Sequence, residues 1–152
     1  MKSAKNRDGQ IAATVTRIST AGLRVTGARQ SIIEILIDAK TPLSVDELEA
    51  KSSGRFDLVT VYRTMEVFVD KGIVDRILLE DGKSLFALAD AHEHSHHIIC
   101  RECHKTERIE FCMGGELERY ASSRGFSNLS HTIEVFGVCV SCKKSAKAEL
   151  CE

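Results

Sequence analysis

Residues 58–88 read LVTVYRTMEVFVDKGIVDRILLEDGKSLFAL and contain the pattern that decides the fold of the first half of the chain. Apolar side chains recur there at helical spacing, and Gly72 follows where a residue ending a helix is expected. Two β-type segments come next, 73–79 and 84–88, joined by an Asp81-Gly82 turn. The stretch therefore predicts a helix over 58–71 followed by a two-stranded hairpin. The apolar stripe of this helix consists of Val61, Met65, Phe68 and Val69.

Further helices are expected upstream of this stretch. Apolar residues at roughly helical spacing indicate a first helix that ends before Gly22. Thr26 is the expected N-cap of a second helix. Ser44-Val-Asp-Glu47 has the capping-box pattern and opens a short third helix. Three or four short helices followed by a hairpin are typical of a winged helix-turn-helix domain.

The helix over 58–71 is the expected recognition helix. Its apolar stripe leaves Thr60, Tyr62, Arg63 and Thr64 near the N-terminal end and off the core, and this part of the second helix faces the major groove in such domains. Arg63 suits a phosphate or a guanine edge, and Tyr62 suits a thymine methyl group. Two alternatives stay open, because the same face also fits solvent and winged helices also bind proteins.

The charge of the chain is nearly balanced but unevenly distributed. The 21 Lys and Arg residues against 22 Asp and Glu residues give a net charge of −1, which argues neither for nor against a polyanionic partner. Residues 1–30, however, carry six basic side chains against one acid. We expect this basic arm, ending at Arg24 and Arg29, to contact the DNA backbone.

All six cysteines and all six histidines lie in residues 92–152. This change of composition predicts two domains, 1–90 and 91–152. The sequence has no window of about 18 uninterrupted apolar residues, so it predicts no membrane span. The N-terminus also lacks the apolar core of a secretory signal. We therefore expect a cytoplasmic protein in a reducing compartment, where clustered cysteines indicate metal or redox chemistry rather than disulfides.

Two CxxC pairs, Cys100/Cys103 and Cys139/Cys142, predict one structural zinc site with four thiolate ligands. A thioredoxin-like redox pair would need a βαβ context that is missing here. The long gap between the pairs predicts an inserted subdomain with a strand over 107–112, a helix over 116–123 and a strand over 128–136. Cys112 is left over, either as a small core residue or as a soft ligand. Cys151 is most simply a bystander, although it could compete as a ligand.

The segment His92-Glu-His-Ser-His-His97 is the densest run of ligand-type residues in the chain. In an extended chain His92, His94 and His96 project to one side and His97 to the other. Four imidazoles suit Zn²⁺, Fe²⁺, Ni²⁺ or Cu²⁺, while the alternative is a charged loop. The run also matches HExxH, but that protease motif requires a helix, and no apolar helical stripe accompanies it. His131 is expected on the apolar side of its strand, which is the usual place of a core histidine.

These residues resemble the ferric uptake regulator family of bacterial metal-dependent repressors over about residues 17–142. The resemblance rests on motifs in a fixed order along the chain. They are Leu23-Arg-Val-Thr26 with Arg29, Thr60-Val-Tyr-Arg63, Gly72-Ile-Val74, Asp81-Gly-Lys-Ser-Leu-Phe86, the His-rich run, Cys100-x-x-Cys103, Ile109-Glu-Phe111, and His131 eight residues before Cys139.

The resemblance implies an α+β homodimer in which an N-terminal winged helix precedes a small α/β dimerisation domain with a Zn(Cys)₄ site. It implies a repressor of metal-uptake genes that binds a palindromic double-stranded DNA operator when a regulatory metal is bound. It implies no enzymatic activity, no small-molecule substrate and no membrane. The regulatory ligands that it implies are Asp75, His94, His96, His97 and Glu110 at the hinge, and a further site of His96, Glu116 and His131.

The chain departs from the family pattern in places that affect the regulatory metal. Many iron-type members have a histidine where this chain has Thr41-Pro42, and a glutamate where it has Ala87. Asp75, the closely spaced C-terminal CxxC and Cys112 look closer to the zinc uptake regulator branch. The expected regulatory metal is therefore Fe²⁺ or Zn²⁺. The alternatives are a peroxide-sensing repressor of the same family and, more remotely, a zinc hydrolase of the HExxH type.

Overall fold

The structure is a computed structural model that describes residues 2–39, 41–89, 96–109, 111–112 and 114–143. The chain divides into two compact units, Met1–His92 and Glu93–Glu152, and each is described by itself. No helix within these described ranges is long and apolar enough to cross a membrane.

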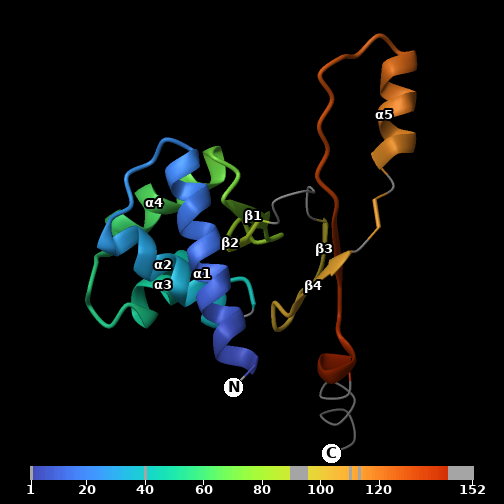
Figure 1. Cartoon of the computed structure of the whole chain (residues 1–152). Coiled ribbons are helices and arrows are strands. Elements are labelled where there is room, and N and C mark those ends of the chain that lie inside the picture. The colour runs from blue at the N-terminus through green and yellow to red at the C-terminus, as the bar shows by residue number, and fades with distance from the viewer. Residues whose placement is uncertain (1, 40, 90–95, 110, 113, 144–152) are drawn as a thin grey trace, which may run out of the picture. The chain divides into compact units, whose positions relative to one another are not determined.

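The first unit consists of four helices followed by an antiparallel hairpin (Figure 1). This order confirms the expected winged helix-turn-helix arrangement, and the expected helix over 58–71 ends one residue earlier than predicted. The elements are α1 (Lys2–Thr20), α2 (Gly27–Ala39), α3 (Val45–Lys51), α4 (Leu58–Asp70), β1 (Val74–Leu78) and β2 (Ser84–Leu88).

Local side-chain caps explain where these helices begin. The hydroxyl of Ser44 accepts the N–H of Glu47 and the Glu47 carboxylate accepts the N–H of Ser44, so the predicted capping box is present at α3. Asp57 caps α4 by accepting the N–H of Thr60 at 2.8 Å. Hydrogen bonds from the Thr60 side chain and from the Thr60 N–H lower the pKa of the Asp57 carboxyl. Gly72, with a φ of +62°, then turns the chain out of α4.

The core of the first unit lies where the helices meet the hairpin. Ile32, Leu48, Met65 and Phe68 are completely buried, so one side chain or more comes from each of α2, α3 and α4. The hairpin joins this core through Phe86, whose backbone exchanges two hydrogen bonds with Leu43. The core therefore fixes how the recognition helix and the wing are presented.

One residue of the recognition helix differs from the sequence prediction. Thr64 was expected off the core, yet it is buried with 7% of its surface exposed. The reason is its spacing: Thr64 follows Val61 by three residues and precedes Phe68 by four, so all three lie on one helix face. The exposed face of α4, opposite these residues, is thus narrower than the sequence suggested.

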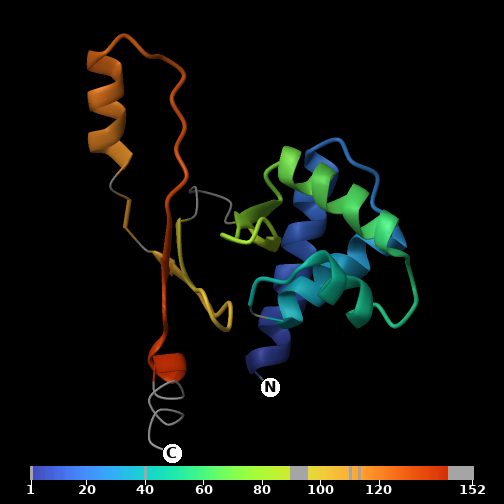
Figure 2. The same ribbon diagram turned by 180° about the vertical axis from the view of Figure 1, so that it is seen from behind.

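Within its described residues, the second unit contains a three-stranded sheet, one named helix and a short helical turn at 140–143 (Figure 2). The strand order is β4-β3-β5, with β3 antiparallel to β4 and parallel to β5. A long extended segment leads from the end of the helix back to the sheet. The elements are β3 (His96–Cys100), β4 (Thr106–Ile109), α5 (Gly114–Ser123) and β5 (Glu134–Gly137).

The predicted strands of the second unit were too long. Within the described residues the first ends at Ile109, and Cys112 lies outside any strand. The second was expected over 128–136 but begins only at Glu134, and Asn128 has a left-handed backbone with a φ of +55°. A residue in that conformation cannot continue a strand. The predicted helix begins two residues earlier than expected, at Gly114.

Candidate metal centres

The first candidate centre is formed by the four cysteines of the two CxxC pairs. Cys100 ends β3 and Cys103 lies in the following turn, while Cys139 and Cys142 follow β5. The parallel pairing of β3 with β5 brings the ends of these strands together. The four sulfurs consequently lie within 4.8 Å of one another.

The sulfur positions fit a tetrahedral zinc ion. The Sγ atoms of Cys100 and Cys142 are 3.9 Å apart, and those of Cys103 and Cys139 are 3.7 Å apart. Zinc–sulfur bonds of about 2.3 Å require tetrahedral edges of about 3.8 Å. The donor set and its spacing therefore match a closed Zn(Cys)₄ site.

The ionisation of these thiols is already uneven. Backbone N–H groups of Cys103 and Cys139 lower the pKa of the Cys100 thiol to about 6. Hydrogen bonding to the backbone of Cys142 also lowers the pKa of Cys139. The pKa of Cys142 is raised to about 12, mainly by its side-chain hydrogen bonds to Cys139 and Cys103. A bound cation would remove this difference in ionisation between the thiols, because a coordinating thiol is deprotonated outright.

The second candidate centre joins His96, Cys112 and His131. The Nε2 atom of His96 lies 3.2 Å from the Nε2 atom of His131 and 3.2 Å from the Sγ atom of Cys112. The distance from that sulfur to His131 Nε2 is 3.1 Å. His96 is 2% exposed, and Cys112 is exposed to solvent. Three potential ligands therefore converge from β3, from the residues before α5 and from the segment before β5.

Neighbouring groups orient these three side chains. His131 Nδ1 lies 3.0 Å from a carboxylate oxygen of Glu118, which only accepts hydrogen bonds, so Nε2 of this ring is left to face the centre. The N–H of Ile133 donates to His96 Nδ1 at 3.2 Å, which fixes the orientation of this ring. The N–H of Gly114 donates to the Cys112 sulfur at 3.1 Å.

Gly114 also gives His131 its room. A Cβ atom built on this glycine would lie 1.9 Å from Cε1 of His131 and 2.1 Å from its Nε2. No side chain at this position is compatible with the observed place of the ring. The first residue of α5 therefore sets how closely His131 approaches the other two ligands.

The structure brings only some of the predicted regulatory residues together. His96 and His131 meet, whereas His97 is buried on the opposite side of β3 from His96, as alternation along a strand requires. The Glu116 side chain is 79% exposed and lies 4.0 Å from Arg119. Asp75 belongs to β1 of the first unit. His94 and Glu110 lie outside the described residues.

Two residues of the second centre were missed or left open by the sequence. Cys112 was ambiguous there, and Glu118 was not considered. Gly114 and Glu118 are four residues apart on α5 and so share a helix face, while Glu116 points elsewhere. A helix start at Gly114 would have identified Glu118, but the predicted start at residue 116 removed that signal.

The apolar strand side expected to hold His131 as a core histidine is absent. Residues 128–133 are not part of a strand, and Val135 is 47% exposed. His131 instead faces polar and sulfur groups. His96 begins β3, whereas residues 92–95 of the HExxH match lie outside the described residues.

The predicted DNA-contacting residues lie on or near α4 in the first unit. Tyr62 is 51% exposed and Arg63 is also exposed, while Thr60 is half-buried beside the Asp57 cap. Arg29 donates to the backbone carbonyl of Arg24 at 2.7 Å, so this arginine also shapes the segment before α2.

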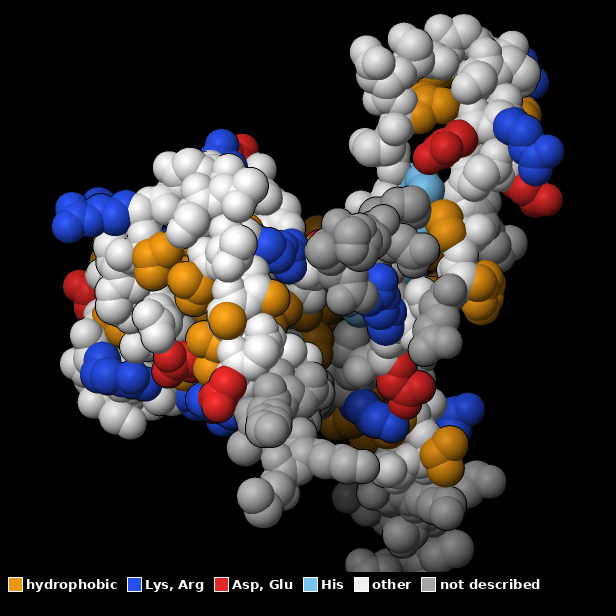
Figure 3. All heavy atoms as spheres, in the orientation of Figure 1, with side chains coloured by type: hydrophobic (Ala, Val, Ile, Leu, Met, Phe, Trp, Pro, Cys, Tyr) orange, Lys and Arg blue, Asp and Glu red, His pale blue; other side chains and the backbone are white. Residues whose placement is uncertain are grey.

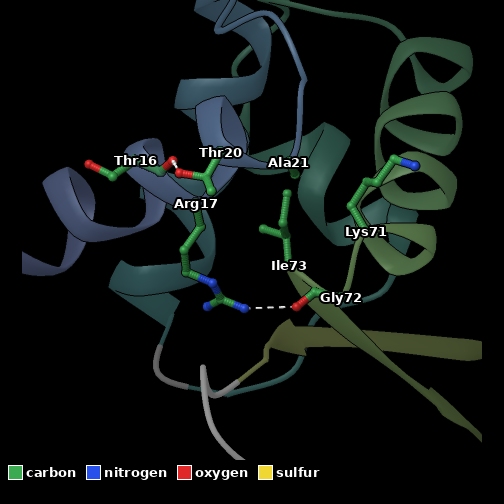
Figure 4. Close-up of a pocket in the computed structure, with 7 residues that line it drawn as sticks. All are labelled: Thr16, Arg17, Thr20, Ala21, Lys71, Gly72 and Ile73. Carbon is green, nitrogen blue, oxygen red and sulfur yellow. Dashed lines mark hydrogen bonds between the residues drawn. The ribbon is translucent and has the colours of Figure 1, made fainter.

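Other basic residues of the N-terminal arm are engaged inside the first unit. Arg17 lies at a pocket of about 430 Å³ (Figure 4) and donates to the carbonyls of Gly72 and Ala89 at 2.7 and 2.6 Å. Arg7 binds both carboxylate oxygens of Asp38, at 2.5 and 2.7 Å. These two arginines hold α1 to the rest of the unit, so the basic arm has a structural role as well.

Comparisons with known proteins agree with this architecture. The model of the ferric uptake regulator family matches residues 20–136. The peroxide-responsive repressor PerR of Staphylococcus aureus is 33% identical over 135 residues, which cover 86% of this chain and 89% of that protein. Among solved structures, the ferric uptake regulator of Vibrio cholerae is 30% identical with a TM-score of 0.65, covering 80% of this chain and 96% of the other. Holo XcZur is 28% identical with a TM-score of 0.67, covering 88% and 96%.

Proposed function

The chain belongs to the ferric uptake regulator family, and from this premise we propose that it is a metal-dependent transcriptional repressor that binds operator DNA as a homodimer. One observation carries the proposal: the second unit holds two separate groups of metal-ligating side chains. One group is a complete tetrathiolate and the other offers three ligands. This division suits one structural ion and one exchangeable ion.

The tetrathiolate group is proposed to hold structural Zn²⁺. Cys100 ends β3 and Cys103 lies in the following turn, while Cys139 and Cys142 follow β5. A zinc ion bound there would crosslink the two strand ends. The described sheet is small, and a metal crosslink compensates for a limited apolar core.

The second group is proposed to hold the exchangeable regulatory metal, Fe²⁺ or Zn²⁺. His96 and His131 supply imidazole nitrogens, and Glu118 fixes the orientation of His131. An ion held by His96 and His131 would join β3 to the segment that precedes β5. The participation of Asp75, His94, His97, Glu110 and Glu116 remains a prediction from the family resemblance.

The first unit is proposed to bind DNA through α4. Tyr62 and Arg63 are exposed near its N-terminal end, where a recognition helix meets the major groove. The proposed phosphate contacts come from Arg24, Arg29 and the backbone near Thr60. A repressor acting on operator DNA is expected in the cytoplasm, and nothing in the proposal requires catalytic turnover.

The second unit is proposed to form the homodimer. Apolar side chains appear on its surface in the space-filling view (Figure 3). Leu117 and Tyr120 of α5 are 55% and 63% exposed, and Phe126 is 67% exposed. Exposed apolar side chains of this size are typical of an interface between subunits. A symmetric dimer presents two recognition helices, which accounts for a palindromic operator.

A peroxide-sensing repressor is the second candidate, because a peroxide-responsive repressor is 33% identical to this chain. In that case Fe²⁺ would occupy the exchangeable site, and peroxide would oxidise a ligand histidine. Peptide mass analysis of the Fe²⁺-loaded protein after peroxide treatment distinguishes the two candidates. A gain of one oxygen atom on His94 or His96 would favour the peroxide sensor.

The proposed function is tested by operator binding in buffered metal solutions. The purified dimer is titrated onto a panel of palindromic duplexes at fixed salt, separately with Fe²⁺, Zn²⁺ and Mn²⁺. We expect at least one metal to increase affinity reversibly, with loss on chelation. If DNA affinity is the same with every exchangeable cation removed, the chain is a zinc-containing DNA-binding protein and not a metal sensor.

A further inference from the structure

We propose that Cys112 is a ligand of the exchangeable site, which makes this site a mixed centre of two imidazoles and one thiolate that takes Zn²⁺ in preference to Fe²⁺ or Mn²⁺. This inference rests on the proposed function, because it concerns the same site. Cys112 belongs to neither CxxC pair, and its sulfur lies with His96 and His131 rather than with the four clustered cysteines.

The geometry supports coordination by all three side chains. In a tetrahedral zinc site, bonds of about 2.0–2.1 Å to nitrogen and about 2.3 Å to sulfur place such ligand atoms about 3.3–3.6 Å apart. The observed separations among His96, Cys112 and His131 are 3.1–3.2 Å. Each pair therefore has to open by only a few tenths of an ångström to accept an ion.

The surroundings of the sulfur also fit a ligand. Cys112 lies two residues before the start of α5. The N–H of Gly114, the first residue of α5, donates to the Cys112 Sγ atom at 3.1 Å. Such a donor stabilises negative charge on sulfur. The carboxylate of Glu118 orients His131 from the other side of the ring, which is the common arrangement around metal-bound histidines.

The donor set decides which metal the site prefers. Thiolate and imidazole ligands suit Zn²⁺, whereas carboxylate and water ligands suit Mn²⁺. Affinity for Zn²⁺ also exceeds affinity for Fe²⁺ and Mn²⁺ in the general order for divalent ions. Because one of the three converging ligands is sulfur, the site selects the softer cation.

Cobalt spectroscopy tests this inference directly. The full-length protein is first loaded with one equivalent of Zn²⁺ per chain to fill the four-cysteine site, and then titrated with Co²⁺. We expect the first equivalent of Co²⁺, which is the second metal ion per chain, to produce a thiolate-to-cobalt charge-transfer band. The zinc content should stay at one per chain. Cys112→Ser should lose that band, and Thr132→Ala, which changes an exposed neighbour of His131, should keep it.

Metal competition provides the second measurement. In Cys112→Ser we expect Zn²⁺ affinity at this site to fall at least tenfold while Mn²⁺ affinity changes much less. Gly114→Ala should also weaken the site, because its Cβ atom would meet the His131 ring, while the four-cysteine site keeps its zinc. Both variants can be checked for folding by that retained zinc.

The outcomes separate this inference from the proposed function. A wild-type protein without the charge-transfer band, or a band of equal strength in Cys112→Ser, would overturn the role of Cys112. The proposed function would survive either result if operator binding still required a metal. Conversely, metal-independent operator binding would remove the sensor role but leave the assignment of the ligands intact.

Discussion

At the scale of single residues, the family resemblance and the structure assign different glutamates, Glu116 and Glu118, to the exchangeable site. The sequence resemblance assigns Glu116 to it, whereas in the structure Glu118 contacts His131 Nδ1 and Glu116 is 79% exposed. We expect Glu118→Gln to lower metal affinity by about 10–100-fold, because a residue that orients a ligand histidine has effects of this size. Glu116→Gln should have little effect in the same competition assay. The reverse result would reinstate the assignment made from the sequence.

Arg63 carries the corresponding prediction for DNA binding. This residue is exposed on α4, next to Tyr62. If it contacts a base, Arg63→Ala should weaken operator binding by about 1–3 kcal/mol and relax sequence preference at one position. If it contacts only phosphate, affinity should fall similarly on all duplexes and the salt dependence should decrease. Fluorescence anisotropy on matched and mutated duplexes measures both, and unchanged affinity would place Arg63 outside the interface.

At the scale of elements, the start of α4 depends on an ionised side chain. Asp57 accepts the N–H of Thr60, and hydrogen bonds from the Thr60 side chain and from this N–H lower the pKa of Asp57 below its ordinary value. A lowered pKa means that the contribution to stability is present above the unfolded-state pKa of about 3.9 and is lost as the pH falls through the folded-state value.

Asp57→Ala should therefore destabilise the first unit most clearly near neutral pH. The difference in unfolding free energy between wild type and variant should shrink as the pH falls below about 4. Urea denaturation followed by helical circular dichroism at several pH values measures this difference. If the difference in unfolding free energy between wild type and variant stays constant down to low pH, the cap does not depend on the charge of Asp57.

The helices of the first unit could be predicted because their start signals are local. Ser44 and Glu47 form a capping box within four residues, and Thr26 Oγ1 accepts the N–H of Arg29 at 3.3 Å. The strands of the second unit could not be delimited in this way, since their ends depend on partners far along the chain. Asn128 shows the difficulty, because nothing nearby in the sequence indicates its left-handed backbone.

The candidate metal ligands also differ in whether a local sequence pattern predicts them. The four-cysteine site could be predicted from spacing, because each CxxC pair is a local unit. The second centre combines β3, the residues before α5 and the segment before β5, so its members share no local pattern. The sequence supplied His96 and His131 through the family resemblance. Cys112 and Glu118 became clear only when α5 was seen to begin at Gly114.

At the scale of the whole molecule, the two metal centres should fail in different ways. Cys100 is buried and its sulfur lies 3.9 Å from that of Cys142, so replacing it breaks the proposed crosslink between strand ends. We expect Cys100→Ser to lose its structural zinc, to unfold the second unit and to abolish the dimer. The first unit has its own buried core and should keep its helices.

Mild chelation should have the opposite pattern, because it removes only the exchangeable ion. The dimer and one zinc per chain should persist, since a closed site with four thiolates releases zinc reluctantly, while operator affinity falls and returns when metal is restored. Sedimentation, metal content and anisotropy on the same samples compare the two perturbations. A folded, zinc-free dimer of Cys100→Ser would refute the structural role of the four cysteines. Monomers produced by mild chelation would mean instead that dimerisation, and not only DNA affinity, depends on the exchangeable ion.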